Sequence, residues 1–151
     1  MKKVLFVCHG NICRSPMAEF MFKKMVKDAG LAAEDFVIDS AAVSTEEIGH
    51  DMYPPAQKKL LEKDVPFEAR RARQITAADY EKFDVICAMD VKNLYYMQRV
   101  WHKDPQNKVR LLLSAAGKDT DIADPWYTGD FEKTWLDLQE GLSALLKLLL
   151  R

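Results

Sequence analysis

The chain has 151 residues, of which 48% are hydrophobic and 30% charged, and this composition excludes a disordered or fibrous protein. The length predicts one domain with a single core. Lysine and arginine number 22 against 23 aspartates and glutamates, so the formal net charge of −1 offers no overall attraction to nucleic acid or an anionic membrane, and any anion site must be local.

The first predicted element is a buried strand over residues 3–8, an apolar run of the kind found in parallel sheets. His9 breaks this run before it reaches the length of a signal-peptide core, and no apolar segment approaches the roughly 18 residues of a membrane span. Ser15 and Pro16 predict the N-cap and the first position of a helix, and apolar residues keep helical spacing from there to Gly30.

Three more strands are predicted, over residues 36–40, 84–89 and 108–114. A loop of about a dozen residues separates the second strand from a helix that begins at Pro54, and a loop of that length often carries function. Asp90 is the predicted N-cap of the helix between the last two strands, which we expect to run through VKNLYYMQRVW.

The last predicted helix begins near Asp130 and carries an apolar stripe that we assign to core packing, formed by Phe131, Trp135, Leu138, Leu142, Leu145 and Leu149. The repeated alternation of strand and helix predicts an α/β fold: one domain over residues 1–151, with a four-stranded parallel sheet and helices on both faces. Ligands of such sheets bind at the carboxyl ends of the strands. The segment after the first strand falls at that edge, and so should Asp124.

The loop between the first strand and the first helix has the composition of an anion site. A helix N-terminus offers unpaired N–H groups and the positive end of the helix dipole. Gly10 and Asn11 tolerate left-handed backbone angles, which lets successive amides point inward. Arg14 adds a planar guanidinium that grips two phosphate oxygens at once. We therefore expect the loop to hold inorganic phosphate or another oxyanion.

Cys8 lies at the base of this predicted anion-binding loop, where a helix N-terminus and a cation favour a thiolate nucleophile. Ser15 is placed to donate a hydroxyl hydrogen bond to that sulfur. The alternative is that Cys8 is an ordinary buried strand residue and Arg14 a surface charge. Glycine, asparagine, arginine, serine and proline all occupy useful positions in this segment, so we favour the nucleophile.

The segment VCHGNICRSPMAE resembles the signature of the low-molecular-weight protein tyrosine phosphatases. The resemblance extends through IDSAAVS, ARQIT, DVICAMDVKNL and DPWY, and so covers essentially the whole chain. It implies hydrolysis of phosphotyrosine and aryl phosphate monoesters through a cysteinyl-phosphate intermediate. In that mechanism Cys8 attacks phosphorus, while Arg14 and the loop amides hold the equatorial oxygens.

A phenolate leaving group has a pKa near 10, so its loss at neutral pH benefits from an acid beside the ester oxygen. Asp124 is the candidate acid, because Pro125 restricts it to an extended backbone and Trp126 and Tyr127 offer an aromatic wall for a phenyl ring. The family's Asp-Pro-aromatic-Tyr pattern matches these positions. The alternative is an ordinary acidic turn.

Other roles are implied by the resemblance alone. Asn11 matches a residue that holds the loop through a hydrogen-bond network that includes the serine matching Ser40. Cys13 matches the family's second cysteine, which can form a disulfide with the nucleophile and protect it from irreversible oxidation. Simple packing is the alternative role for Cys13.

Further loop positions are expected to contact substrate, among them His9 and Ile12. Glu46 stands where relatives often place an aromatic or large apolar pocket residue, and Arg70 stands where some eukaryotic members have a histidine. These two departures predict an unusually charged rim around the pocket.

The same residues are compatible with three alternative functions. Arsenate reduction relays a disulfide to two downstream cysteines, yet only Cys87 follows the loop, inside a predicted strand. The protein-arginine phosphatase branch carries threonine where this chain has Ile12. The isoleucine favours phosphotyrosine as the substrate. A non-catalytic phosphate-binding or redox-sensing module is the third alternative, and Asp124 argues against it.

We expect no metal and no cofactor, because a zinc site takes four converging ligands and Cys8 and Cys13 have no second close pair. The chain has three cysteines, an odd and sparse set that suits a reducing compartment, so the predicted location is the cytoplasm. The predicted partners are proteins that carry phosphotyrosine, with no nucleic acid and no membrane, and the expected state is a monomer.

Overall fold

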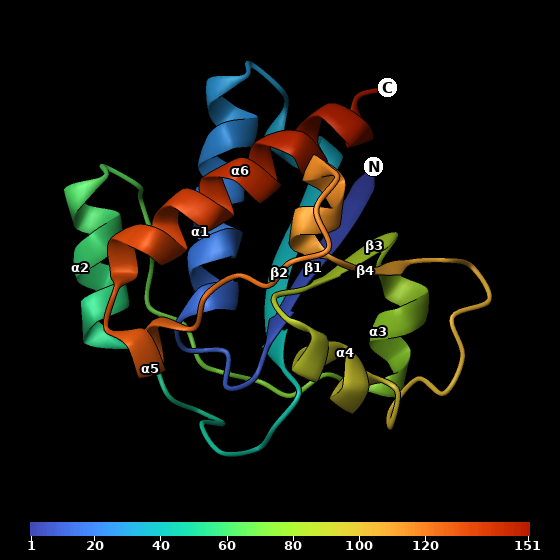
Figure 1. Cartoon of the computed structure of the whole chain (residues 1–151). Helices are drawn as coiled ribbons and strands as arrows, with labels where there is room; N and C mark the ends of the chain where they lie inside the picture. Colours follow the sequence, from blue (N-terminus) through green and yellow to red (C-terminus); the bar gives the residue numbers. More distant parts are fainter.

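Four strands form the sheet at the centre of the structure, a computed structural model that describes all of residues 1–151 (Figure 1). The strands are β1 (Lys2–Cys8), β2 (Phe36–Ala42), β3 (Val85–Ala88) and β4 (Val109–Leu111). They are all parallel and lie in the order β2-β1-β3-β4. The predicted four-stranded parallel sheet is therefore confirmed.

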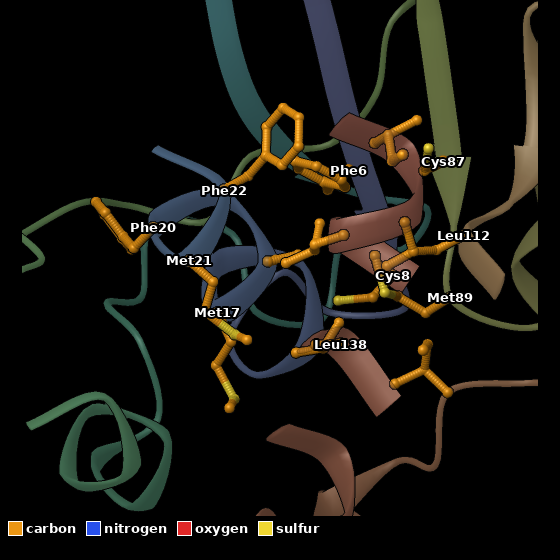
Figure 2. Packing of buried hydrophobic residues seen from close by; sticks show 14 of the residues in the cluster. Phe6, Cys8, Met17, Phe20, Met21, Phe22, Cys87, Met89, Leu112 and Leu138 are labelled. Atoms are coloured by element: carbon orange, nitrogen blue, oxygen red, sulfur yellow. The ribbon is translucent and has the colours of Figure 1, made fainter. Parts of the chain in front are cut away.

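Strand β1 lies inside the sheet, and its side chains alternate between two cores. Val4, Phe6 and Cys8 point into the larger core, against helices α1 (Arg14–Asp28) and α6 (Phe131–Leu149). Figure 2 shows this packing, in which the ring of Phe6 meets that of Phe22 edge to face at 5.6 Å between centroids. The apolar stripe of the last predicted helix supplies this core with its buried leucines, Leu138, Leu142 and Leu145.

The opposite face of the sheet carries Leu5 and Val7. They share a smaller core with residues from α3 (Ala77–Lys82) and α4 (Val91–Met97). Helices thus cover both faces of the sheet, as the alternating sequence pattern predicts. The remaining helical elements are η1 (Ala33–Asp35), α2 (Pro54–Glu62), η2 (Leu112–Ala116) and α5 (Pro125–Thr128).

Helix α1 begins at Arg14, two residues before the predicted first helical position. Cys13 is its N-cap residue and makes no side-chain capping bond. Ser15, the predicted cap, lies in the first turn, and its hydroxyl lies 3.0 Å from the Cys8 sulfur instead. The prediction of Ser15 as the N-cap is therefore wrong, because the helix already begins at Arg14 and Ser15 is a helical residue.

The fourth strand is shorter than predicted. It ends at Leu111, and the next residues turn into the 3-10 helix η2, where the Ser114 hydroxyl donates to the Leu111 carbonyl at 2.6 Å. Gly141 on α6 lets this turn approach closely, since a Cβ there would lie 2.8 Å from the Leu112 Cγ. Contact with α6 therefore accompanies the end of the strand.

Helix α4 is also shorter than predicted, since it ends at Met97 and the segment up to Trp101 forms turns. The Trp101 indole N–H donates to the Thr76 carbonyl at 3.1 Å, which ties the end of this segment to the start of α3. None of the helices combines the length and the hydrophobicity needed to cross a membrane.

The direction of strand addition changes at β1, because β2 lies on one side of it and β3 on the other. The carboxyl ends of β1 and β3 meet at one edge of the sheet, the usual ligand position in such folds. The loop into α1, the start of α4, the loop before α2 and the loop before α5 all reach this edge (Figure 1).

Candidate active site

The loop between β1 and α1 turns at Asn11, which has the left-handed φ of 60° that the sequence predicts. Gly10 does not share this conformation, so that part of the prediction is wrong. A Cβ at residue 10 would lie 3.2 Å from the Glu47 Cγ. A larger residue here would therefore crowd the Glu47 side chain, and the position makes no use of glycine's backbone freedom.

Cys8 ends β1 with a side chain that is buried at the base of a pocket. Its sulfur lies 3.0 Å from the Ser15 Oγ and accepts the Asn11 backbone N–H at 3.3 Å. The positive end of the α1 dipole lies close by. These features stabilise negative charge on the sulfur.

The side-chain amide of Asn11 is held in one orientation by two donors. A guanidinium nitrogen of Arg70 and, at 3.3 Å, the backbone N–H of Arg73 both donate to its Oδ1. Neither donor can accept a hydrogen bond. The Asn11 Nδ2 must therefore face the two serines, and it donates to Ser15 at 2.8 Å and to Ser40 at 3.0 Å.

This orientation sets the direction of the next hydrogen bonds. Because the Ser15 oxygen already accepts from Asn11, its own proton has two acceptors in reach: the Cys8 sulfur at 3.0 Å and, farther away, the Ala41 carbonyl at 3.5 Å. The Ser40 hydroxyl donates to the carboxylate of Glu19, which is itself buried and accepts from Lys23 at 2.6 Å. The network expected for Asn11 and Ser40 is present, and Glu19 is a member that the sequence did not reveal.

Arg14 is buried in the pocket wall. Its Nη1 donates to Asp90 at 2.8 Å and to the Ile122 carbonyl at 2.9 Å, while its Nη2 lies 3.3 Å from the Asp124 carboxylate. Burial alone would lower the pKa of Arg14, but the negative charges of Cys8, Asp124 and Asp90 raise it. The guanidinium therefore stays charged and has a fixed position beside the sulfur.

Asp90 has a second function that the sequence did not indicate. One carboxylate oxygen accepts the Asn93 backbone N–H at 2.8 Å, the predicted cap of α4, and the other holds Arg14. The two partners lie in different parts of the chain. Only the cap has a local sequence signal, so only the cap could be predicted.

Asp124 has the extended backbone that the following proline predicts, with φ −87° and ψ 109°. Its carboxylate also accepts the Trp126 backbone N–H at 3.1 Å and so caps the short helix α5. The side chains of Trp126 and Tyr127 are exposed, and the Trp126 ring lies 4.9 Å from that of Tyr53. The two exposed rings form one wall of the pocket.

The pocket has a volume of about 120 Å³ and brings together most of the predicted site. The residues that line it are Cys8, His9, Gly10, Ile12, Cys13, Arg14, Glu46, Glu47, Asp124, Trp126 and Tyr127. The side chains of Asn11, Ser15 and Ser40 are buried and do not line the pocket. They contact Cys8, or each other, as supports of the loop.

Two carboxylates stand on the side of the pocket formed by the loop before α2. Glu46 lies 2.9 Å from the His9 Nε2, and Glu47 lies 2.6 Å from the His50 Nδ1. Glu46 was expected there, whereas Glu47 had no sequence signal beyond being its neighbour. These two carboxylates give this side of the rim its charge.

Arg70 does not lie at the rim of the pocket, so the position predicted for it is wrong. It is partly buried behind the loop, where it holds Asn11, and its Nη1 is buried without a hydrogen-bond partner. Burial lowers the pKa of Arg70, and the nearby Glu19 carboxylate opposes that shift. The rim therefore owes its charge to other residues.

The three cysteines are free and buried thiols. Burial, together with the negative charges of Cys8 and Asp124, raises the pKa of Cys13 far above its usual range. Burial in β3 raises the pKa of Cys87 to about 12. Both thiols therefore remain protonated at neutral pH.

The family of this chain follows from a comparison with known proteins. The sequence profile described as low molecular weight phosphotyrosine protein phosphatase matches residues 3–151. The chain belongs to this family. The resemblance noted in the sequence is thereby confirmed, and with it the enzyme class: a protein tyrosine phosphatase, which is a phosphoric monoester hydrolase.

Relatives in this phosphatase family align over nearly the whole chain. The low molecular weight protein-tyrosine-phosphatase YfkJ of Bacillus subtilis is 36% identical over 148 residues, which are 97% of this chain and 94% of that protein. The low molecular weight phosphotyrosine protein phosphatase of Sus scrofa is 42% identical over 151 residues, with the same two coverages.

Solved structures of phosphatases share the fold. The crystal structure of YfkJ from Bacillus subtilis has a TM-score of 0.92 at 35% identity and covers 97% of this chain and 93% of its own. That of DARP, a drosophila arginine phosphatase, has a TM-score of 0.84 at 34% identity and covers 97% and 96%. The fold is therefore shared by phosphatases described for different substrates.

Proposed function

We propose that this phosphatase hydrolyses phosphotyrosine in proteins, and small aryl phosphates, by nucleophilic attack of Cys8 on phosphorus. The observation that carries the proposal is the convergence of Cys8, Arg14 and Asp124 on one pocket of about 120 Å³. A sulfur, a fixed guanidinium and a carboxylate are the groups that the two chemical steps require.

Substrate binding uses the loop and Arg14. The amides of the loop face the phosphate oxygens, and the guanidinium pairs with two of them. Asp90 and the Ile122 carbonyl hold the Nη1 of Arg14, so the guanidinium is already oriented before substrate arrives. Such prior orientation lowers the cost of stabilising the charge that builds up on the transferring phosphoryl group.

In the first step the Cys8 sulfur forms a bond to phosphorus as the bond from phosphorus to the tyrosine oxygen breaks. Asp124 donates its proton to the leaving oxygen, so tyrosine departs as a neutral phenol. The Ser15 hydroxyl, oriented by Asn11, stabilises the thiolate before attack. Cys13 remains a protonated thiol that lines the wall of the pocket.

In the second step water attacks the cysteinyl phosphate. Asp124, now a carboxylate, takes a proton from the water as its oxygen bonds to phosphorus, and the bond from sulfur to phosphorus breaks. Phosphate leaves and the thiolate is restored. Neither step calls for a metal ion or a cofactor.

The proposal also covers the domain extent, oligomeric state and cellular location of the enzyme. Residues 1–151 form one phosphatase domain that acts as a monomer, and the match over residues 3–151 supports this extent. Cytoplasmic location is supported by three free thiols, which suit a reducing compartment. The substrates are proteins that carry phosphotyrosine.

The test is turnover of p-nitrophenyl phosphate in the presence of a chelator. We expect the wild-type protein to be active and Cys8→Ser to lose all measurable turnover, because a serine hydroxyl is a far weaker nucleophile at neutral pH. Cys87→Ser is the matched control, since this thiol is buried in β3 away from the pocket.

Residual activity of Cys8→Ser near the wild-type level would refute the assignment. A parallel assay of phosphotyrosine and phosphoarginine peptides separates the two phosphatase chemistries, and we expect phosphotyrosine to be the better substrate. Arsenate reduction with thioredoxin should be absent.

A further inference from the structure

Arg99, just after helix α4, is a cation held in place without an acidic partner. The arginines that form salt bridges are Arg14 and Arg73. The guanidinium carbon of Arg99 instead lies 5.3 Å from the ring centroid of Tyr95 and 5.1 Å from that of Tyr96. Stacking on aromatic faces orients a guanidinium while its N–H edge stays available for an anion.

Tyr95, Tyr96 and Arg99, here called the aromatic platform, stand beside the mouth of the pocket. The Tyr96 ring lies 6.3 Å from the ring of His9, which lines the pocket. Helix α4 begins at the same sheet edge as the loop into α1 (Figure 1). All three platform side chains are exposed, so a bound protein can reach them.

The mouth of the pocket is electrically asymmetric. Glu46 and Glu47 line it from the loop before α2, and Glu46 pairs with His9 at 2.9 Å. The platform, whose Tyr96 ring lies near the His9 ring, adds the positive charge of Arg99. A pocket of about 120 Å³ has room for one phosphorylated side chain, so the rest of a protein substrate must lie across this mouth.

We propose that the aromatic platform binds an acidic residue that flanks the phosphotyrosine in the protein substrate, with Arg99 as the residue that determines this specificity. The inference rests on the proposed function. An extended chain advances roughly 3.3–3.6 Å per residue, so a carboxylate about two to four positions from the phosphotyrosine reaches Arg99. An acidic residue that approaches Glu46 and Glu47 instead meets like charge and is repelled.

The test uses three phosphotyrosine peptides: one with neutral flanks, one with two glutamates on the N-terminal side and one with two glutamates on the C-terminal side. The readout is kcat/KM for each acidic peptide divided by kcat/KM for the neutral one. We expect this ratio to be about three to five for one acidic peptide and below one for the other. The higher ratio should fall as salt is added.

Arg99→Gln should bring the higher ratio close to one. Lys92→Gln is the matched control, because it removes the same charge from an exposed position on α4 outside the platform, and its ratios should stay near those of the wild type. Equal ratios for both acidic peptides in the wild type would overturn the inference, as would an unchanged ratio in Arg99→Gln or an equal loss in Lys92→Gln. Turnover of p-nitrophenyl phosphate, which has no flanking residues, separates these results from a failure of the proposed function.

Discussion

Asp124 is held close to the reacting groups by contacts on both of its carboxylate oxygens. One accepts the Trp126 backbone N–H and the other lies 3.3 Å from Arg14. Both contacts fix the carboxyl group at the mouth of the pocket, beside the position that the leaving oxygen takes in the proposed reaction.

Asp124→Asn keeps the shape of this side chain and removes the proton. We expect kcat for phosphotyrosine and phenyl phosphate to fall by about 10²–10⁴-fold. The fall should shrink for p-nitrophenyl phosphate, whose leaving group needs less protonation. Steady-state kinetics over a series of aryl phosphates measures this, with Asp119→Asn, an exposed acid of the same loop, as the control. An equal loss across the series would argue against proton donation.

Several site residues could be found from the sequence because their signals are local. Cys8, Gly10, Asn11, Arg14 and Asp124 all lie in short motifs next to a strand end or a proline. Residues that act through distant partners carry no such signal.

Asp90 and Glu19 illustrate this limit. Asp90 meets Arg14 from 76 positions away, and Glu19 meets Ser40 from 21 positions away. Neither pairing follows from spacing along the chain, so both became visible only in the three-dimensional structure.

At the scale of elements, α3 is linked to β4 through one carboxylate. Asp104 accepts from the Tyr80 hydroxyl at 2.6 Å and from the backbone N–H groups of Lys108 at 2.8 Å and Val109 at 3.0 Å. Burial would raise the pKa of Asp104, yet these hydrogen bonds lower it below its ordinary value. The folded state therefore binds the carboxylate form more favourably than the acid.

A group with a lowered folded-state pKa stabilises the fold above its unfolded pKa and loses that contribution as the pH falls through the folded value. We expect Asp104→Asn to lower the free energy of unfolding at pH 7 by roughly 1 kcal/mol, since the side chain is exposed and solvent weakens its hydrogen bonds. The difference from the wild type should shrink below about pH 4. Urea unfolding at several pH values measures it, and a difference that does not change with pH would contradict the account.

The shortened fourth strand shows why element boundaries were harder to predict than elements. The run VRLLLS is apolar enough for either a strand or a helical turn, and periodicity cannot separate them over so few residues. Leu112 contacts Gly141, a residue far away in the sequence, and this close approach is consistent with the helical turn η2. That contact exists only after the chain has folded.

At the scale of the whole molecule, the pocket is assembled from segments that the sheet brings to one edge. The thiol comes from the end of β1, the acid from the loop before α5 and the carboxylate that holds Arg14 from the loop after β3. The alternation of strands and helices was enough to predict the sheet and this edge. This alternation did not predict the order of the strands. The order depends on which strands pair with each other, and strands that pair can lie far apart in the sequence.

The claim that supports the proposed reaction is that phosphate is transferred to Cys8 before it reaches water. Asp124→Asn lacks the base for the second step, so mixing it with p-nitrophenyl phosphate and quenching in acid should trap the intermediate. Intact mass spectrometry should then show a gain of one phosphoryl group, and peptide mapping should place it on Cys8. No gain in mass, or a phosphoryl group on Ser15, Cys13 or His9 instead, would contradict the account.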